Sequence, residues 1–103
     1  MTADTEVVTD QSKKTKKSSK EPGRFNVIFH NDDMTPMDFV AQLIQTIFHH
    51  DIDTARDLTI KIHVEGKAVV GVYTYEVAEQ KSIESVAIAR NNGFPLTVTV
   101  ESE

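Results

Sequence analysis

Between residues 24 and 48 the apolar side chains change their spacing from every second residue to a helical repeat. The first stretch, RFNVIFH, places Phe25, Val27 and Phe29 on one side, which is typical of a strand with one buried face. After the turn residues NDD, apolar residues recur at three- and four-residue intervals: Phe39, Val40, Leu43, Ile44, Ile47 and Phe48. A strand followed directly by an amphipathic helix indicates a domain of mixed class.

Polar residues mark where this helix is expected to begin and end. Thr35 is predicted to cap its amino terminus, Pro36 suits the first helical position, and Asp38 favours the positive end of the helix dipole. At the other end the helical spacing continues as far as the histidine pair at 49–50. The pattern therefore predicts one helix that starts after Thr35 and ends at these histidines.

Residues 52–65 give two conflicting signals. The segment DIDT opens like a capped helix, yet the apolar residues that follow alternate as in a strand: Leu58, Ile60, Ile62 and Val64. Periodicity alone favours a strand that turns at Glu65-Gly66 into a second strand. Taken by itself, this stretch predicts a hairpin.

The last third of the chain has more regular patterns. A β-branched segment at 68–73 predicts a strand, and Thr74 is predicted to cap a third helix with stop signals at Arg90 and Gly93. Residues 95–101 alternate again and predict a final strand. The apolar side of the third helix is expected to carry Val77, Ile83, Val86 and Ala87. The complete pattern predicts an α+β fold with a small, mostly antiparallel sheet.

Composition changes abruptly at Pro22-Gly23. Residues 1–23 contain five lysines, four acids and few large apolar side chains, which predicts a flexible amino-terminal extension. Residues 24–103 carry six basic and twelve acidic side chains, a net charge of −6, and are predicted to form the folded domain. The run KKTKKSSK is expected to be a solvated linker. An alternative function is that of a nucleic-acid-associated protein that uses this run.

Several classes of protein are excluded by what the sequence lacks. There are no cysteines, so disulfides, cysteine zinc sites and thiol catalysis are excluded. No apolar run is long enough to cross a bilayer, and the first residues lack the order of a secretory signal. The four glycines are isolated and form no nucleotide-binding loop. We therefore expect a cytoplasmic protein.

The groups available for catalysis suggest a binding module more than an enzyme. His30 with Asp32 and Asp33 offers metal ligands, but no paired-histidine spacing supports a metal site. A metal-dependent hydrolase that uses these three residues is a weaker alternative. Two carboxylates in a turn are more often turn residues than a general acid and base.

The end of the first strand provides a more suggestive set of groups. Asn31 and Asp32 precede a helix that presents Met37 and Val40 on one side. Amide and carboxylate oxygens accept hydrogen bonds from an ammonium group, while an adjacent hollow can take an apolar side chain. These residues predict an amphipathic ligand whose ammonium group adjoins a large apolar group.

Taken together, several segments resemble the ClpS adaptor family: NDDMTPMDFV, His63 with GK at 66–67, GVYTYEVAEQK, and AR followed by FPL. The resemblance covers about residues 24–101. It implies an adaptor, not an enzyme, that delivers substrates with a free, bulky hydrophobic first residue (Leu, Phe, Tyr or Trp) to the AAA+ unfoldase of the Clp protease, the bacterial N-end rule. It also implies three helices on a three-stranded antiparallel sheet after a flexible extension, with no cofactor or metal. Residues 52–65 would then be a second helix rather than a hairpin.

The same resemblance assigns roles to individual residues. The residues implied to hydrogen-bond the substrate's α-amino group are Asn31, Asp32 and His63. The rim of the pocket is implied to carry Asp33, Met34 and Thr35. The apolar walls of the pocket are implied to comprise Met37, Val40, Thr59, Ile62 and Leu96, with Met37 excluding β-branched first residues. Docking onto the amino-terminal domain of the unfoldase is implied to use Glu76 and Lys81.

Thr59 departs from the family, which commonly has a methionine on this pocket wall. Threonine is smaller and carries a hydroxyl group, so the pocket is expected to be wider or more polar at that edge. The partners implied are the unfoldase and peptides or proteins with such first residues, and a monomer is the simple expectation.

Overall fold

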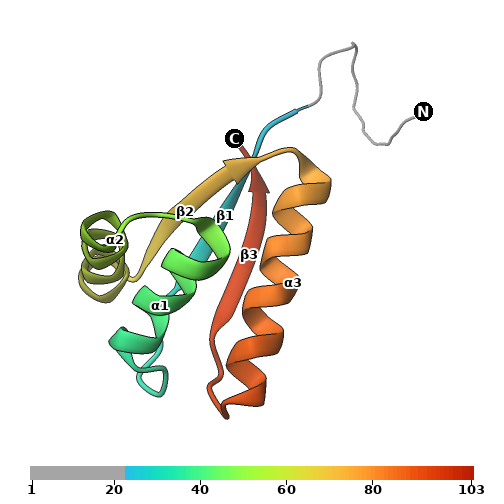
Figure 1. Cartoon of the computed structure of the whole chain (residues 1–103). Coiled ribbons are helices and arrows are strands. Elements are labelled where there is room, and N and C mark those ends of the chain that lie inside the picture. The colour runs from blue at the N-terminus through green and yellow to red at the C-terminus, as the bar shows by residue number, and fades with distance from the viewer. Residues whose placement is uncertain (1–22) are drawn as a thin grey trace.

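The computed structural model describes residues 23–103, which form three strands and three helices (Figure 1). In chain order these are β1 (Phe25–His30), α1 (Met37–Phe48), α2 (Ile52–Glu65), β2 (Lys67–Tyr73), α3 (Tyr75–Asn91) and β3 (Thr97–Ser102). The strands make one antiparallel sheet in the order β2-β1-β3. The predicted α+β class, with three helices on a three-stranded antiparallel sheet, is therefore confirmed. The predicted extension lies outside the described residues, except for Gly23.

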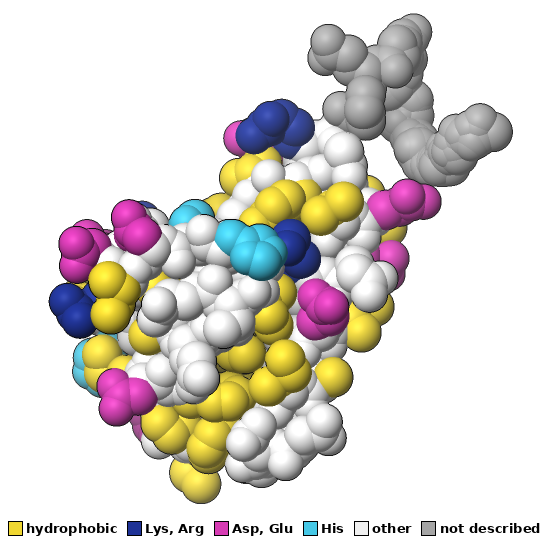
Figure 2. All heavy atoms as spheres, in the orientation of Figure 1, with side chains coloured by type: hydrophobic (Ala, Val, Ile, Leu, Met, Phe, Trp, Pro, Cys, Tyr) yellow, Lys and Arg dark blue, Asp and Glu magenta, His cyan; other side chains and the backbone are white. Residues whose placement is uncertain are grey.

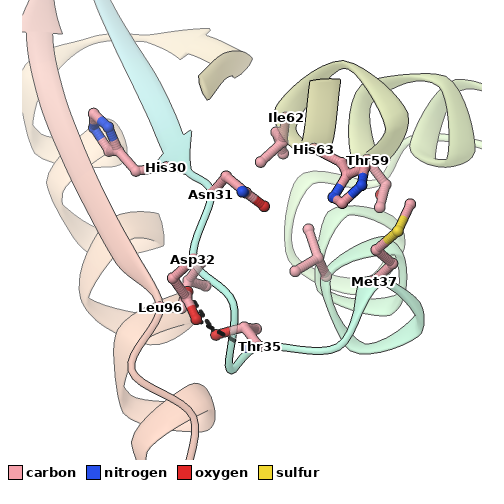
Figure 3. A pocket seen from close by; sticks show the side chains of 10 residues that line it. His30, Asn31, Asp32, Thr35, Met37, Thr59, Ile62, His63 and Leu96 are labelled. Atoms are coloured by element: carbon pink, nitrogen blue, oxygen red, sulfur yellow. Dashed lines mark hydrogen bonds between the residues drawn. The ribbon is translucent and has the colours of Figure 1, made fainter. Parts of the chain in front are cut away.

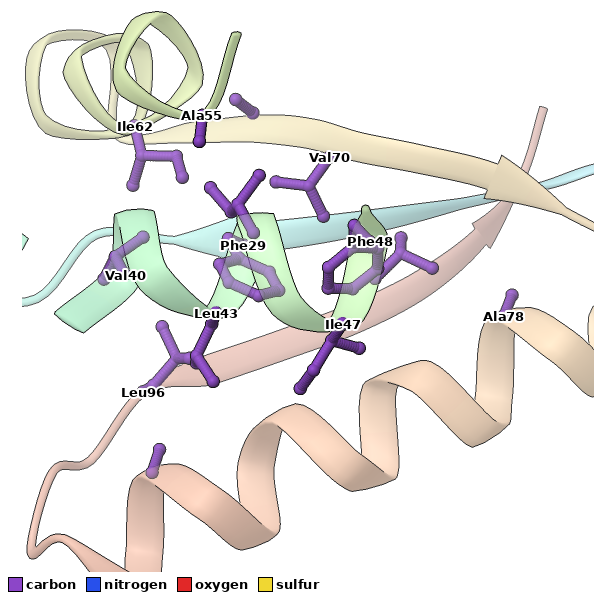
Figure 4. Close-up of a cluster of buried hydrophobic side chains, with 14 residues drawn as sticks. Phe29, Val40, Leu43, Ile47, Phe48, Ala55, Ile62, Val70, Ala78 and Leu96 are labelled. Carbon is purple, nitrogen blue, oxygen red and sulfur yellow. The ribbon is translucent and has the colours of Figure 1, made fainter. Parts of the chain in front are cut away.

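The hydrophobic core lies between the sheet and the helices, as Figure 4 shows. Phe29 of the central strand is fully buried, and its ring meets Phe48 of α1 edge-on at 5.5 Å between ring centroids. Of the six apolar residues predicted from the helical spacing, Phe39 is half-buried and the other five are buried: Val40, Leu43, Ile44, Ile47 and Phe48. This burial holds α1 against the sheet, and the short loop at 31–36 places the first turn of α1 directly after the end of β1, where the candidate site lies.

Residues 52–65 form α2, so the hairpin predicted from periodicity is wrong and the helix implied by the family resemblance is confirmed. The Asp51 carboxylate accepts a 2.8 Å hydrogen bond from the Thr54 backbone N–H, and hydrogen bonds from Thr54 lower the pKa of Asp51. At the other end Gly66 adopts φ 93°, which favours glycine and ends the helix. The buried face of α2 comprises Ala55, Thr59 and Ile62. The strand-like alternation instead leaves Ile60 and Val64 exposed to solvent.

The starts of α1 and α3 differ from the predictions in their capping. Pro36, not Thr35, occupies the position before α1, and no side chain caps that helix. Thr35 instead directs its hydroxyl group to Asp32, which is described with the site below. Thr74 does precede α3, but its side chain makes no capping hydrogen bond.

The buried side of α3 is lined by small residues rather than by the predicted apolar ones. Its buried positions are Ala78, Ser85 and Ala89. Small side chains allow the helix to lie close to the sheet, so the larger side chains turn outward. The predicted apolar side is thus wrong for Val77, Ile83 and Ala87, which are exposed, whereas Val86 is half-buried. No helix in residues 23–103 has both the length and the apolarity that crossing a membrane requires.

Candidate functional site

A hollow of about 250 Å³, counting the part open to solvent, lies where the end of β1 meets α1 and α2. Its ten lining residues come from β1 and the loop after it, from both helices, and from the segment before β3 (Figure 3). They are His30, Asn31, Asp32, Thr35, Met37, Val40, Thr59, Ile62, His63 and Leu96. Apolar walls with a few polar groups on one side are the usual composition of a small binding site.

A backbone hydrogen bond holds Asn31 beside the end of α2, the helix that carries His63. The N–H of Asn31 donates to the carbonyl of Gly66 at 2.8 Å, which fixes the end of β1 against the end of α2. His63 lies in the last turn of that helix. Figure 3 shows the Asn31 side chain pointing toward the His63 ring from across the hollow. The turn at Gly66 thus brings together two predicted amine-binding residues.

The Asp32 carboxylate is held by the loop that follows it. One oxygen accepts hydrogen bonds from the backbone N–H groups of Met34 and Thr35, both at 2.8 Å. The other oxygen accepts from the Thr35 hydroxyl at 2.7 Å, which Figure 3 marks with a dashed line. An ionised carboxylate offers about four acceptor positions. Asp32 therefore stays fixed at the lip of the hollow and retains capacity for a further donor.

The walls of the hollow are apolar and come from three separate segments. Val40 of α1, Ile62 of α2 and Leu96 before β3 are buried and form its inner surface. Met37 in the first turn of α1 is 41% exposed and lies at the opening. A flexible methionine at the opening can adjust to the shape of an entering side chain.

Thr59 lines the hollow with its hydroxyl group already satisfied. The side chain is only 5% exposed, and Oγ1 donates a 2.7 Å hydrogen bond to the Ala55 carbonyl within α2. Because this bond uses the only donor of the hydroxyl, Thr59 changes the hollow through its size more than through polarity. Of the two expectations for this position, a wider edge of the hollow is therefore favoured over a more polar one.

Not every predicted site residue lines the hollow. Asp33 and Met34 are exposed on the loop after β1 and do not line it. Glu76 is exposed in the first turn of α3, and Lys81 is half-buried one turn further along the same helix. The predicted docking residues therefore lie on a different element from the hollow.

His30 is a lining residue that sequence reasoning considered only as a metal ligand. Its Nε2 lies 2.8 Å from the Thr99 hydroxyl of β3, and Figure 3 shows its ring apart from the Asp32 carboxylate. In residues 23–103 no three His, Cys, Asp or Glu side chains gather closely enough to hold a metal ion. The only sequence signal for His30 as a lining residue was its place immediately before Asn31.

Comparison with known proteins places this arrangement in a family. The family model "ATP-dependent Clp protease adaptor protein ClpS" matches residues 20–99. The chain is 46% identical over 87 residues to the ClpS adapter protein of Edwardsiella ictaluri, covering 84% of this chain and 82% of that one. It is 40% identical over 92 residues to the one from Vibrio atlanticus, covering 89% and 87%.

A solved structure agrees in fold. It is Agrobacterium tumefaciens ClpS2 bound to L-phenylalaninamide, with a TM-score of 0.78 and 36% identity. The match covers 81% of this chain and all of that one. Sequence matches over most of the chain and a shared fold lead to the same assignment: the chain belongs to the ClpS family and is an adaptor of the ATP-dependent Clp protease rather than an enzyme.

Proposed function

We propose that this chain binds proteins with a free, bulky hydrophobic first residue and delivers them to the Clp AAA+ unfoldase. The observation that carries the proposal is the hollow itself, in which oxygen and nitrogen acceptors sit beside apolar walls. The related ClpS2 binds L-phenylalaninamide, a molecule with a free amine next to a phenyl ring. The amine matches the polar acceptors of the hollow, and the phenyl ring matches its apolar walls.

The substrate's α-amino group is assigned to Asn31, Asp32 and His63. An ammonium group carries three donors, and these residues offer an amide oxygen, a carboxylate and a ring nitrogen as acceptors. The fixed loop around Asp32 holds the charged acceptor in place before the ligand arrives, which reduces the entropy lost on binding. Each hydrogen bond to a charged group contributes roughly 1.5–3 kcal/mol.

The first side chain of the substrate is assigned to the apolar walls formed by Met37, Val40, Thr59, Ile62 and Leu96. Complete burial of a Leu- or Phe-sized side chain contributes about 1.5–3 kcal/mol. Together with two or three bonds to the amine, and after the cost of immobilising a flexible chain end, this gives about micromolar affinity. Such an affinity suits an adaptor that has to release what it delivers.

Delivery is assigned to a different part of the molecule. Glu76 is exposed at the start of α3, where the amino-terminal domain of the unfoldase can reach it without covering the hollow. Lys81, also assigned to docking, has a second role because its ammonium group donates a 2.7 Å hydrogen bond to the Ile47 carbonyl. The family resemblance assigns the predicted extension, residues 1–23, to the unfoldase side of the complex.

Titration with short peptides that differ only at the first residue tests the proposal. Peptides that begin with Leu, Phe, Tyr or Trp are expected to bind, and those that begin with Ala or Gly are not. Acetylation of the Phe peptide removes the charge and two donors, so it should nearly abolish binding. If the acetylated peptide binds within about threefold of the free one, the assigned amine site is wrong.

A further inference from the structure

One wall of the hollow comes from a segment that belongs to no helix or strand. Leu96 lies between α3, which ends at Asn91, and β3, which begins at Thr97. It is only 1% exposed and lines the hollow, and Figure 4 shows its side chain turned toward α1. Because Leu96 lies outside the helices and strands, contacts other than their regular hydrogen bonds have to fix the position of this wall.

Arg90, in the last turn of α3, supplies such contacts. Its Nη1 donates hydrogen bonds to the carbonyls of Phe94 and Leu96, both at 2.9 Å. This nitrogen carries two hydrogens, so it can serve both carbonyls at once. The guanidinium group is planar and rigid, and it therefore fixes the two oxygens relative to each other and to α3. One side chain thus holds two carbonyls of the segment that leads into β3.

Other contacts hold the start of the same segment between α3 and α1. The Phe94 N–H donates a 2.9 Å hydrogen bond to a carbonyl in the last turn of α3, after a turn in which Gly93 adopts φ 80°. The Phe94 ring meets the Phe39 ring of α1 edge-on, with 4.9 Å between ring centroids. Figure 2 shows hydrophobic side chains gathered here, where the lower end of α1 meets the carboxyl end of α3. Arg90 extends this support from Phe94 to Leu96.

Loss of the Arg90 hydrogen bonds would act on the hollow through Leu96, because Arg90 itself does not line it. Hydrogen bonds from a charged donor are about twice as strong as those between neutral groups. Pro95, between the two bonded carbonyls, has no N–H with which the segment could replace them. A gap of about 0.5–1 Å between two packed atoms already removes a quarter to a half of their attraction. A small retreat of this wall would therefore weaken its contact with a bound side chain.

We propose that Arg90 is a positioning residue for the pocket: its two hydrogen bonds keep Leu96 in contact with the first side chain of the substrate. Arg90 thereby sets how well the pocket distinguishes a smaller first side chain from a larger one. This inference rests on the proposed function, because Leu96 contacts a substrate only when the first side chain occupies the hollow. It gives a role in selectivity to a charged residue that touches no part of the ligand.

The test measures two ligands that fill only the pocket, L-phenylalaninamide and L-leucinamide, by calorimetry with the full chain. Arg90→Met removes the guanidinium group and keeps most of the aliphatic chain. It should weaken L-phenylalaninamide binding by about three- to tenfold, and L-leucinamide binding by at least about twofold more, because the smaller side chain cannot follow a retreating wall. A loss of stability alone lowers both affinities by the same factor and leaves their ratio unchanged. The ratio therefore separates positioning from a purely structural role.

Arg90→Lys keeps one charged donor group, so it should shift the ratio in the same direction by a smaller factor. It carries the test on its own if Arg90→Met does not fold.

Arg24→Met is the matched control. Arg24 is also an exposed arginine, but its Nε donates to the Glu103 carboxylate at 3.1 Å, at the end of β1 away from the hollow. This variant should leave both affinities within about 1.5-fold of wild type. If the Arg90 variants keep the wild-type ratio or shift it toward L-leucinamide, the positioning inference is wrong and the pocket assignment stands. If L-phenylalaninamide fails to bind the wild type, the proposed function fails and this inference with it.

Discussion

Lys81 joins α3 to the end of α1, and replacing it should weaken the fold by a predictable amount. Its Nζ donates a 2.7 Å hydrogen bond to the carbonyl of Ile47, one of the last-turn carbonyls of α1 that have no partner within the helix. The same ammonium lies 5.8 Å from the Phe48 ring centroid and 5.4 Å from that of Tyr73. These distances are within the range of cation–π attraction. One charged group thus bridges three elements.

The size of the effect follows from these contacts. A hydrogen bond from a charged donor contributes roughly 1.5–3 kcal/mol, and each ring about 0.5 kcal/mol or more at a partly exposed site. Lys81→Met keeps most of the aliphatic chain and removes only the ammonium group, so it should lower the free energy of unfolding by about 2–4 kcal/mol. With the slope of unfolding free energy against urea concentration that is usual for small proteins, this loss lowers the urea midpoint by about 1–2 M.

Urea unfolding followed by circular dichroism measures this shift. Lys61→Met, at an exposed lysine on α2, is the control and should change the midpoint by less than about 0.3 M. If Lys81→Met unfolds within about 0.5 kcal/mol of the wild type, the proposed anchoring role is wrong. If Lys81→Met delivers substrates to the unfoldase less well, this is evidence for a docking role only at temperatures where the variant remains folded. Glu76→Ala tests docking separately, at an exposed side chain.

Three further predictions concern single side chains. Asp32→Asn should weaken binding of a Phe-initiated peptide by about tenfold or more in calorimetry, while Asp33→Asn should stay within twofold; equal losses would contradict the separate role of Asp32. Thr59→Val should leave L-phenylalaninamide affinity within about twofold, because the hydroxyl is bonded inside its own helix, and a larger loss would mean that it contacts the ligand. The lowered pKa of Asp51 stabilises the fold fully above its ordinary value of 3.8, and this contribution is lost as the pH falls through the lowered folded value. The thermal midpoint of wild type should therefore exceed that of Asp51→Asn by less at pH 3 than at pH 5, and an equal difference at both pH values would contradict this role of the Asp51 charge.

Local sequence was sufficient to predict an element when its buried face carries large apolar side chains. The helical spacing around Ile44 was clear because α1 turns one side to the core, and the alternation around Phe29 was clear although β1 also buries Ile28. The buried side of α3 was mispredicted because Ala78 and Ala89 are small, so the larger residues of that helix marked its exposed side instead. Hydrophobic spacing identifies a buried face only when that face carries the larger side chains.

The candidate site shows the same division between local and distant information. Asn31, Asp32 and Met37 lie within a few residues of one another, so their proximity could be inferred from one turn. His63 and Leu96 join them only because the sheet and α2 fold together, and they were predicted through the family resemblance alone. Thr35 was expected to cap a helix, but Asp32 competes for its hydroxyl group, and such local competition is common for short polar side chains.

The misleading alternation in α2 also has a physical explanation. Of its four apolar residues, only Ile62 is fully buried and Leu58 is half-buried, whereas Ile60 and Val64 face solvent. Single exposed apolar side chains are normal on protein surfaces, so Ile60 and Val64 carry no information about the buried face of the helix. The buried residues of α2 instead recur at helical spacing, at Ala55, Thr59 and Ile62. The spacing of the apolar residues alone therefore could not distinguish this helix from a strand, whereas the residues that mark its two ends, Asp51 and Gly66, agree with a helix.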